Sequence, residues 1–260
     1  MGDKVEYANK ICQEKEIHIL SFKRKAALKK EAAAQQLMAA GDFAGAIDVL
    51  DELICAYPWE IGSWVSKANA LIKLGEFEAA EETFITGINE YNKWGGPGRP
   101  PQQELAKAYF YYAFMFYDKK FTCTECNISY AERIDDLDDA WALVEEAILL
   151  HSSECEFYLL RALIGWELRH DRVDVLADFN QALELSNLSN ISNRPERQRL
   201  TRARLQTYRS RAEYFLTFEE YDNAMSDVES MLLIDPQNED ALSLKIKILD
   251  QTKVLSEHDL

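Results

Sequence analysis

The chain has 260 residues, of which 47% are hydrophobic and 11% aromatic, so it has ample material for a core and is not of a disordered composition. Only 10 Gly and 6 Pro accompany abundant Ala, Leu and Glu, and this balance favours helix over sheet. The net charge of −16 disfavours binding to nucleic acid or to an anionic membrane surface.

The N-terminal segment 1–26 is expected to be helical and to lead into, or pack on, the helices after residue 26. It carries charges where a signal peptide needs an apolar run, and no stretch of the chain approaches the roughly 18 apolar residues of a membrane span. The five cysteines are scattered and odd in number, which suggests a reducing compartment rather than a disulfide scaffold. We therefore expect a cytoplasmic protein with no membrane association.

The next two segments, 27–60 and 61–94, repeat one pattern. Small, apolar and turn-forming residues recur at a constant offset of 34, in the pairs Ala34 and Ala68, Leu37 and Leu71, Gly41 and Gly75, Phe43 and Phe77, and Ala46 and Ala80. Apolar residues at helical spacing stand on both sides of the glycine, so each segment predicts two helices joined by a turn. Small residues are required because antiparallel helices approach closely only where Ala or Gly faces the partner.

This pattern resembles the tetratricopeptide repeat (TPR) family, whose repeat has a Trp, a Leu-Gly pair, a Tyr, then Ala-x3-Phe and a closing Pro. The second segment has Trp64, Ala80 and Phe84 at matching positions and departs from the family at Lys67. Because the family model is a 34-residue repeat, the resemblance accounts for the interval between the two segments.

The rest of the chain is less regular. A Gly/Pro-rich linker precedes 104–152, a degenerate helix pair with a long insertion at 122–139, and 155–186 is another degenerate pair. Segment 195–236 is again a good copy, and 237–260 is expected to be a helix and tail that cap the last apolar face. The repeats thus occupy about 27–236.

The resemblance implies an all-α fold, a right-handed superhelix (α-solenoid) of about five TPR-like helical hairpins with a C-terminal capping helix. One hairpin cannot bury its own apolar face, so the copies stack, and their first helices line a concave groove. Such grooves hold a peptide or a helix of a partner. We therefore expect a non-catalytic scaffold or adaptor with a protein or peptide partner.

Helical spacing indicates which side chains face that groove. The predicted groove residues are Asn69, Phe110, Phe114, Tyr117, Leu159, Trp166, Arg209 and Glu213. The alternative is that the aromatic residues fill a tightly wound core. Co-chaperones of the family clamp a C-terminal carboxylate with Lys and Asn, but Glu31 and Gln35 stand at the first of those positions, so chaperone tails are not expected as ligands.

Segment 194–211 carries seven Arg against one Glu in an otherwise acidic chain. On a helix these arginines form stripes that suit an acidic peptide or a phosphate. The other interpretation, which we favour, is that they pair with the chain's own carboxylates.

Two cysteines, Cys123 and Cys126, have the spacing of half a zinc site or a redox pair. His151 and Cys155 would complete a set of four ligands. However, about 15 helical residues, or about 22 Å at 1.5 Å per residue, separate the two halves. We therefore predict no metal and no cofactor.

No sequence motif of an enzyme is present, and no catalytic residue is predicted. The acid pairs Asp135-Asp136 and Asp138-Asp139 are interpreted as N-capping residues of the helix that comes after them. Alternative functions are an acidic chaperone or inhibitor of a basic partner and, less favoured, a metal- or redox-linked protein built on Cys123 and Cys126. Formation of a homodimer stays open.

Overall fold

The computed structural model describes residues 27, 29–96, 99–122, 130–189 and 191–258. Within these ranges the regular structure is α-helical and no β-strand occurs. The chain divides into two compact units, Met1–Tyr112 and Ala113–Leu260, and each is described by itself. The predicted helical segment 1–26 lies outside the described residues.

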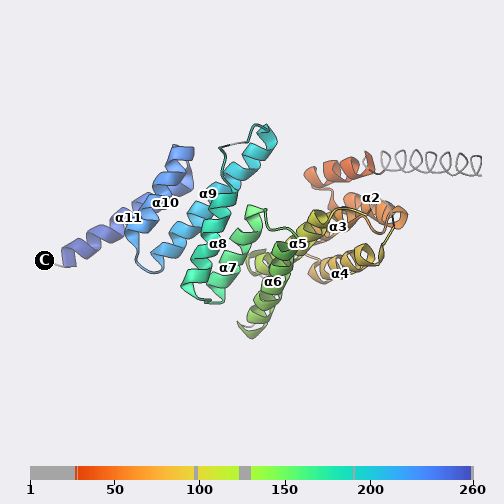
Figure 1. Ribbon diagram of the computed structural model, residues 1–260, viewed down its shortest axis with the longest axis horizontal. Helices are drawn as coiled ribbons and strands as arrows, with labels where there is room; N and C mark the ends of the chain where they lie inside the picture. Colours follow the sequence, from red (N-terminus) through yellow and green to blue (C-terminus); the bar gives the residue numbers. More distant parts are fainter. Residues whose placement is uncertain (1–26, 28, 97–98, 123–129, 190, 259–260) are drawn as a thin grey trace, which may run out of the picture. The chain divides into compact units, whose positions relative to one another are not determined.

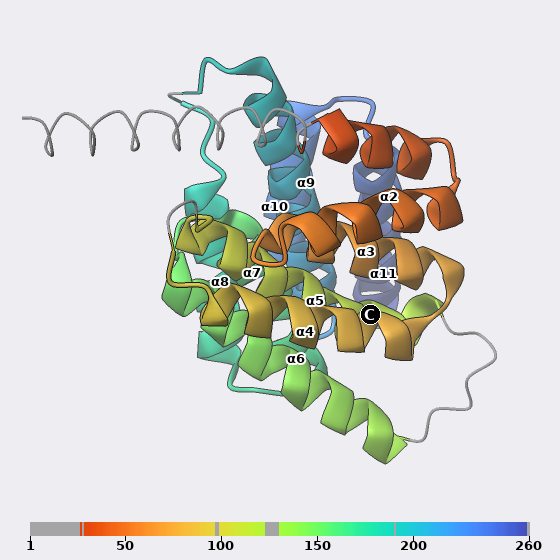
Figure 2. The ribbon, with the colours of Figure 1, turned by 90° about the vertical axis from the view of Figure 1, so that its right-hand side faces the viewer.

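The first unit consists of helices packed in chain order. A helix over 29–39 is followed by α2 (Phe43–Ala56), α3 (Ile61–Leu74) and α4 (Phe77–Lys93), and α5 (Gln102–Thr122) begins here. Figure 2 shows α2, α3 and α4 side by side. Both turns are made by glycines in the left-handed region, Gly41 with a φ of 81° and Gly75 with a φ of 80°. The sequence pattern thus positions these turns as predicted.

The second unit continues the hairpins. Its helices are the end of α5, then α6 (Tyr130–Leu150), α7 (Cys155–Glu167), α8 (Arg172–Leu185), α9 (Arg194–Leu216), α10 (Tyr221–Ile234) and α11 (Glu239–His258). Helix α7 packs on α8, α9 on α10, and α11 lies along α10 (Figure 1). Ala241, Leu244 and Ile248 of α11 are buried in one cluster with α9 and α10, so α11 caps the hairpin as predicted.

Helix α6 begins earlier than the sequence pattern suggested. Residues 130–139 are helical, so the acid pairs at 135–136 and 138–139 lie inside α6 and the interpretation of them as N-caps is wrong. The reason is that the apolar spacing extends one turn further back. Leu137 is 3% exposed and continues the buried row of Ala140 and Val144.

In each well-formed hairpin the two helices meet at alanines that have almost no exposed surface. The alanines of the repeat pattern are at most 1% exposed: Ala34, Ala46, Ala68, Ala80, Ala212 and Ala224. A similar contact is made by Gly87 in α4, where an added Cβ would lie 2.6 Å from the Cβ of Trp64. The requirement for small residues at the helix crossings is therefore met in both units.

A basic residue stands immediately before the buried alanine of three first helices and pairs with an aspartate of a second helix. The ion pairs are Lys67–Asp51 at 2.6 Å, Arg161–Asp178 at 2.7 Å and Arg211–Asp227 at 2.6 Å. Both arginines donate two hydrogen bonds to their carboxylate. Burial raises the pKa of Asp227, and the hydrogen bonds from Arg211 oppose that rise. Arg161 and Arg211 pair with the second helix of their own hairpin, whereas Lys67, where the chain departs from the family pattern, pairs with α2 of the preceding hairpin.

Gly87→Ala is expected to destabilise the protein by about 1–3 kcal/mol, because its Cβ would overlap the Trp64 side chain. Gly62→Ala is the matched control. Its Cβ would meet nothing closer than 3.9 Å, so it is expected to keep or raise stability by up to about 1 kcal/mol. Urea unfolding of the two variants measures the difference, and equal stability would contradict the close contact.

Asp227→Ala is expected to lower the free energy of unfolding by about 3 kcal/mol. The reason is that Arg211, whose side chain is only 17% exposed, loses its carboxylate partner. Asp51→Ala removes the Lys67–Asp51 pair of the first unit, which joins α3 to the preceding helix α2. There the Asp51 side chain is 49% exposed, so a loss below about 1 kcal/mol is expected. Thermal unfolding compares the two, and similar losses would show that burial does not set the energy of these pairs.

Candidate functional site

Three first helices of the second unit bring four of the predicted groove residues together. Tyr117 comes from α5, Trp166 from α7, and Arg209 and Glu213 from α9. Burial raises the pKa of Tyr117 to about 12, and the negative charges of Glu167 and Glu213 contribute to the rise. We call Tyr117, Trp166, Arg209 and Glu213 the first-helix wall.

The members of this wall are held by contacts of their own. The ring of Trp166 meets that of Tyr214 edge-on, with centroids 5.4 Å apart. Arg209 donates a hydrogen bond to Glu213 at 3.3 Å and another to Asp240 of α11 at 2.9 Å. The wall therefore combines aromatic side chains with a charge pair on the surface of α9.

The other predicted groove residues lie in different surroundings. Phe114 is 41% exposed, whereas Leu159 is 5% exposed and belongs to the core cluster of Phe179. Leu159 therefore supports the wall from within and offers no surface to a ligand. Asn69 and Phe110 are half-buried and belong to the first unit.

A cavity of about 760 Å³ opens at the turn ends of α7 and α9, within the range of ligand pockets. We call it the turn cavity. Its lining combines aromatic, basic and aliphatic side chains and one carboxylate: Arg133, Ile134, Leu137, Trp166, Glu167, Arg169, His170, Arg172, Tyr214, Thr217 and Phe218. Trp166 belongs to both the cavity and the first-helix wall.

Two ion pairs surround the cavity. Arg133 pairs with Glu167, and Arg172 pairs with Glu220. The pKa of Glu220 is lowered by its hydrogen bond from Arg172. The guanidinium of Arg172 also lies 5.0 Å from the ring centroid of Phe218. Sequence analysis identified Trp166 alone among the lining residues, although the run Arg169-His170-Asp171-Arg172 at a hairpin turn was a signal for the rest.

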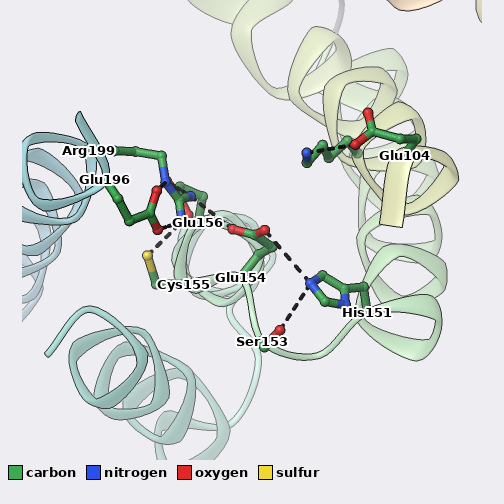
Figure 3. A network of polar contacts seen from close by, with 9 residues as sticks. Glu104, His151, Ser153, Glu154, Cys155, Glu156, Glu196 and Arg199 are labelled. Atoms are coloured by element: carbon green, nitrogen blue, oxygen red, sulfur yellow. Dashed lines mark hydrogen bonds and ion pairs between the residues drawn. The ribbon is translucent and has the colours of Figure 1, made fainter. Parts of the chain in front are cut away.

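Three arginines of segment 194–211, Arg199, Arg209 and Arg211, form ion pairs with carboxylates of the chain. Arg199 donates hydrogen bonds to Glu154 at 2.9 Å, to Glu156 at 2.6 Å and to Glu196 at 2.9 Å (Figure 3). The hydrogen bond to Glu196 is the largest cause of the raised pKa of Arg199. Arg204 donates to the backbone oxygen of Leu183 at 2.8 Å. Arg199 and Arg204 therefore join α9 to neighbouring helices.

Of the four residues weighed as metal or redox ligands, the structure describes only His151 and Cys155. Cys123 and Cys126 lie outside the described ranges. His151 contacts Ser153 at 3.0 Å, while Cys155 is 2% exposed and points to Glu156 (Figure 3). Across the described parts of the chain, no three His, Cys, Asp or Glu residues gather as metal ligands would.

None of the helices that the structure describes combines the length and the hydropathy needed to cross a bilayer.

The sequence and the fold are both similar to those of known proteins. Residues 37–94 match a family model described as tetratricopeptide repeat. A thermophilic TPR protein of Thermus thermophilus is similar in structure, with a TM-score of 0.54 and 17% identity over 86% of this chain and 97% of that one. YrrB, a TPR protein with an unusual peptide-binding site, has a TM-score of 0.51 and 11% identity over 82% and 88%. No curated protein sequence matches.

A larger assembly also contains this fold. The APC/C hetero-tetramer Cut9-Hcn1 has a TM-score of 0.60 and 11% identity, covering 88% of this chain and 37% of that one. Paired helices closed on alanines define a helical-repeat protein of the α-solenoid class. Residues 37–94 match the tetratricopeptide repeat model, and the chain shares the helical-repeat fold of TPR proteins over most of its length.

The environment of Cys155 predicts that its thiol is inert. Burial raises the pKa of Cys155, and the neighbouring Glu156 raises it further, so little thiolate forms near neutral pH. Cys55 is exposed and serves as the internal control. Iodoacetamide labelling of the folded protein at a pH of about 8, read by peptide mass spectrometry, is expected to modify Cys55 and spare Cys155. Equal labelling would contradict this environment.

Proposed function

We propose that this protein is a non-catalytic interaction module that binds an extended segment of a partner protein along the first-helix wall of its second unit. Stacked helical repeats provide extended binding surfaces, and TPR domains are protein-interaction modules in general.

The observation that carries the proposal is the convergence of Tyr117, Trp166 and Glu213 from three successive first helices beside an open cavity. Aromatic side chains supply large contact areas at a small cost in side-chain entropy, and Trp and Tyr are enriched among residues that dominate binding energy. A surface built from three helices also suits an extended ligand better than a compact one. The description of YrrB as a TPR protein with a peptide-binding site is a further support.

The acidic-chaperone alternative has one observation in its favour. Arg199 and Arg211 are paired with carboxylates within the chain, whereas Asp135, Asp138 and Asp139 on α6 are exposed. A basic partner held by such carboxylates would dissociate steeply as salt rises. Peptides selected from a random library therefore distinguish the two functions. A consensus of basic residues among the selected peptides would favour the acidic-chaperone alternative.

Trp166→Ala is expected to weaken peptide binding about 30-fold, the effect of losing a residue worth about 2 kcal/mol. Peptides of twelve residues are selected from a random phage-displayed library on the wild-type protein, and their affinities are measured by fluorescence anisotropy. Leu233→Ala is the control, since Leu233 is 86% exposed on α10 and lies outside the wall. Selected peptides that bind both variants equally would exclude the first-helix wall as the binding surface.

A further inference from the structure

Two hairpin turns of the second unit keep a charged residue where the first unit has glycine. Arg169 has a φ of 58° and Glu219 a φ of 59°, the same left-handed region as Gly41 and Gly75. Side chains other than glycine are disfavoured there. Such strain is retained where the surroundings or a function require it. Of the two residues, Arg169 lines the turn cavity and Glu219 does not.

Arg169 is also the one arginine of the cavity lining that has no ion-pair partner among the described residues. Arg133 and Arg172 are ion-paired with Glu167 and Glu220. The Arg169 side chain makes no hydrogen bond or ion pair within the described ranges and is exposed at the cavity. A guanidinium binds carboxylates in a planar, bidentate geometry. The lining thus presents an available cation in a chain whose net charge is −16.

An aromatic surface adjoins this cation. Tyr214 lies between Trp166 and Phe218, with its ring centroid 5.4 Å from the first and 5.0 Å from the second. Phe218 is 48% exposed although it is a large apolar side chain. At about 760 Å³ the cavity is far larger than a single carboxylate needs, so it has room for an apolar group beside the anion.

We propose that the turn cavity is a specificity subsite that binds an acidic side chain of the partner segment together with an adjacent aromatic or bulky aliphatic side chain. Arg169 binds the carboxylate, and Trp166 and Phe218 contact the apolar group. This inference rests on the proposed function and adds the chemical class of the partner. A peptide is favoured over a nucleic acid because the overall charge repels a polyanion, whereas a single carboxylate meets mainly the local field of Arg169.

The turn geometry provides a clean test. Arg169→Gly removes the guanidinium and gives the turn the residue used at Gly41 and Gly75, so the variant is expected to fold at least as well as wild type. Glu219→Gly makes the same backbone change at the neighbouring turn and leaves the cavity lining intact. Circular dichroism melts of both variants establish that they are folded.

The probes are the twelve-residue peptides selected on the wild-type protein and a copy of each with its acidic residues changed to amides. We expect the selected peptides to contain an acidic residue next to an aromatic or bulky aliphatic one. Arg169→Gly should weaken them at least tenfold, in keeping with the loss of a charge-assisted hydrogen bond. The Glu219→Gly variant should bind the selected peptides at least as tightly as wild type does. The amide copies should bind weakly to wild type and with the same affinity to the Arg169→Gly variant.

The outcomes separate the two proposals. Peptides that depend on Trp166 but bind Arg169→Gly as tightly as wild type, or that carry no acidic residue, overturn the subsite and leave the proposed function standing. Peptides indifferent to both residues, or a library that yields no binder, count against both. An equal loss in Arg169→Gly and Glu219→Gly would assign the effect to turn geometry and overturn the role of the guanidinium.

Discussion

The approach of paired helices at alanine is the constraint on which the rest of this structure depends. With no larger side chain to separate them, the two helices of a hairpin have one favourable register, and that register fixes the neighbours. Arg161 and Arg211 each stand directly before the buried alanine of their helix, and each reaches the aspartate of the paired helix. The packing contact thereby positions a buried ion pair, which on its own would be a poor source of stability.

The same register determines which arginines are paired within the chain. Arg199, Arg204 and Arg211 bind groups on neighbouring helices, so these three arginines cross-link the helices within the chain. At the turn after α7, Arg172 pairs with Glu220, whereas the Arg169 side chain makes no hydrogen bond or ion pair among the described residues. Arg169 stands beside aromatic rings that the hairpins leave partly open.

How much the sequence could predict depends on the same distinction. The regular repeats over 27–94 were predictable because Ala, Gly and Phe recur at one offset and each has a packing role. The α7–α8 hairpin was harder to predict because its spacing differs from that of the regular hairpins. The offset from Ala162 to Val175 is 13 positions, whereas that from Ala212 to Ala224 is 12. The turn cavity was not predictable, since side chains from α6, α7 and α9 meet there and no local pattern records the meeting. Leu159 was assigned to a groove because helical spacing cannot distinguish a ligand-facing side from one covered by a neighbouring helix.

The central claim is that ligand binding occurs on the second unit, at aromatic residues beside Arg169. The most direct measurement is the two-dimensional 15N–1H spectrum of the five tryptophan indoles during titration with a bound peptide. Trp166 lines the turn cavity, and Trp141 contacts His170 at its edge, with ring centroids 4.2 Å apart. We expect the indole signals of Trp141 and Trp166 to shift in proportion to saturation while those of Trp59, Trp64 and Trp94 stay in place. Shifts confined to the latter three would contradict it.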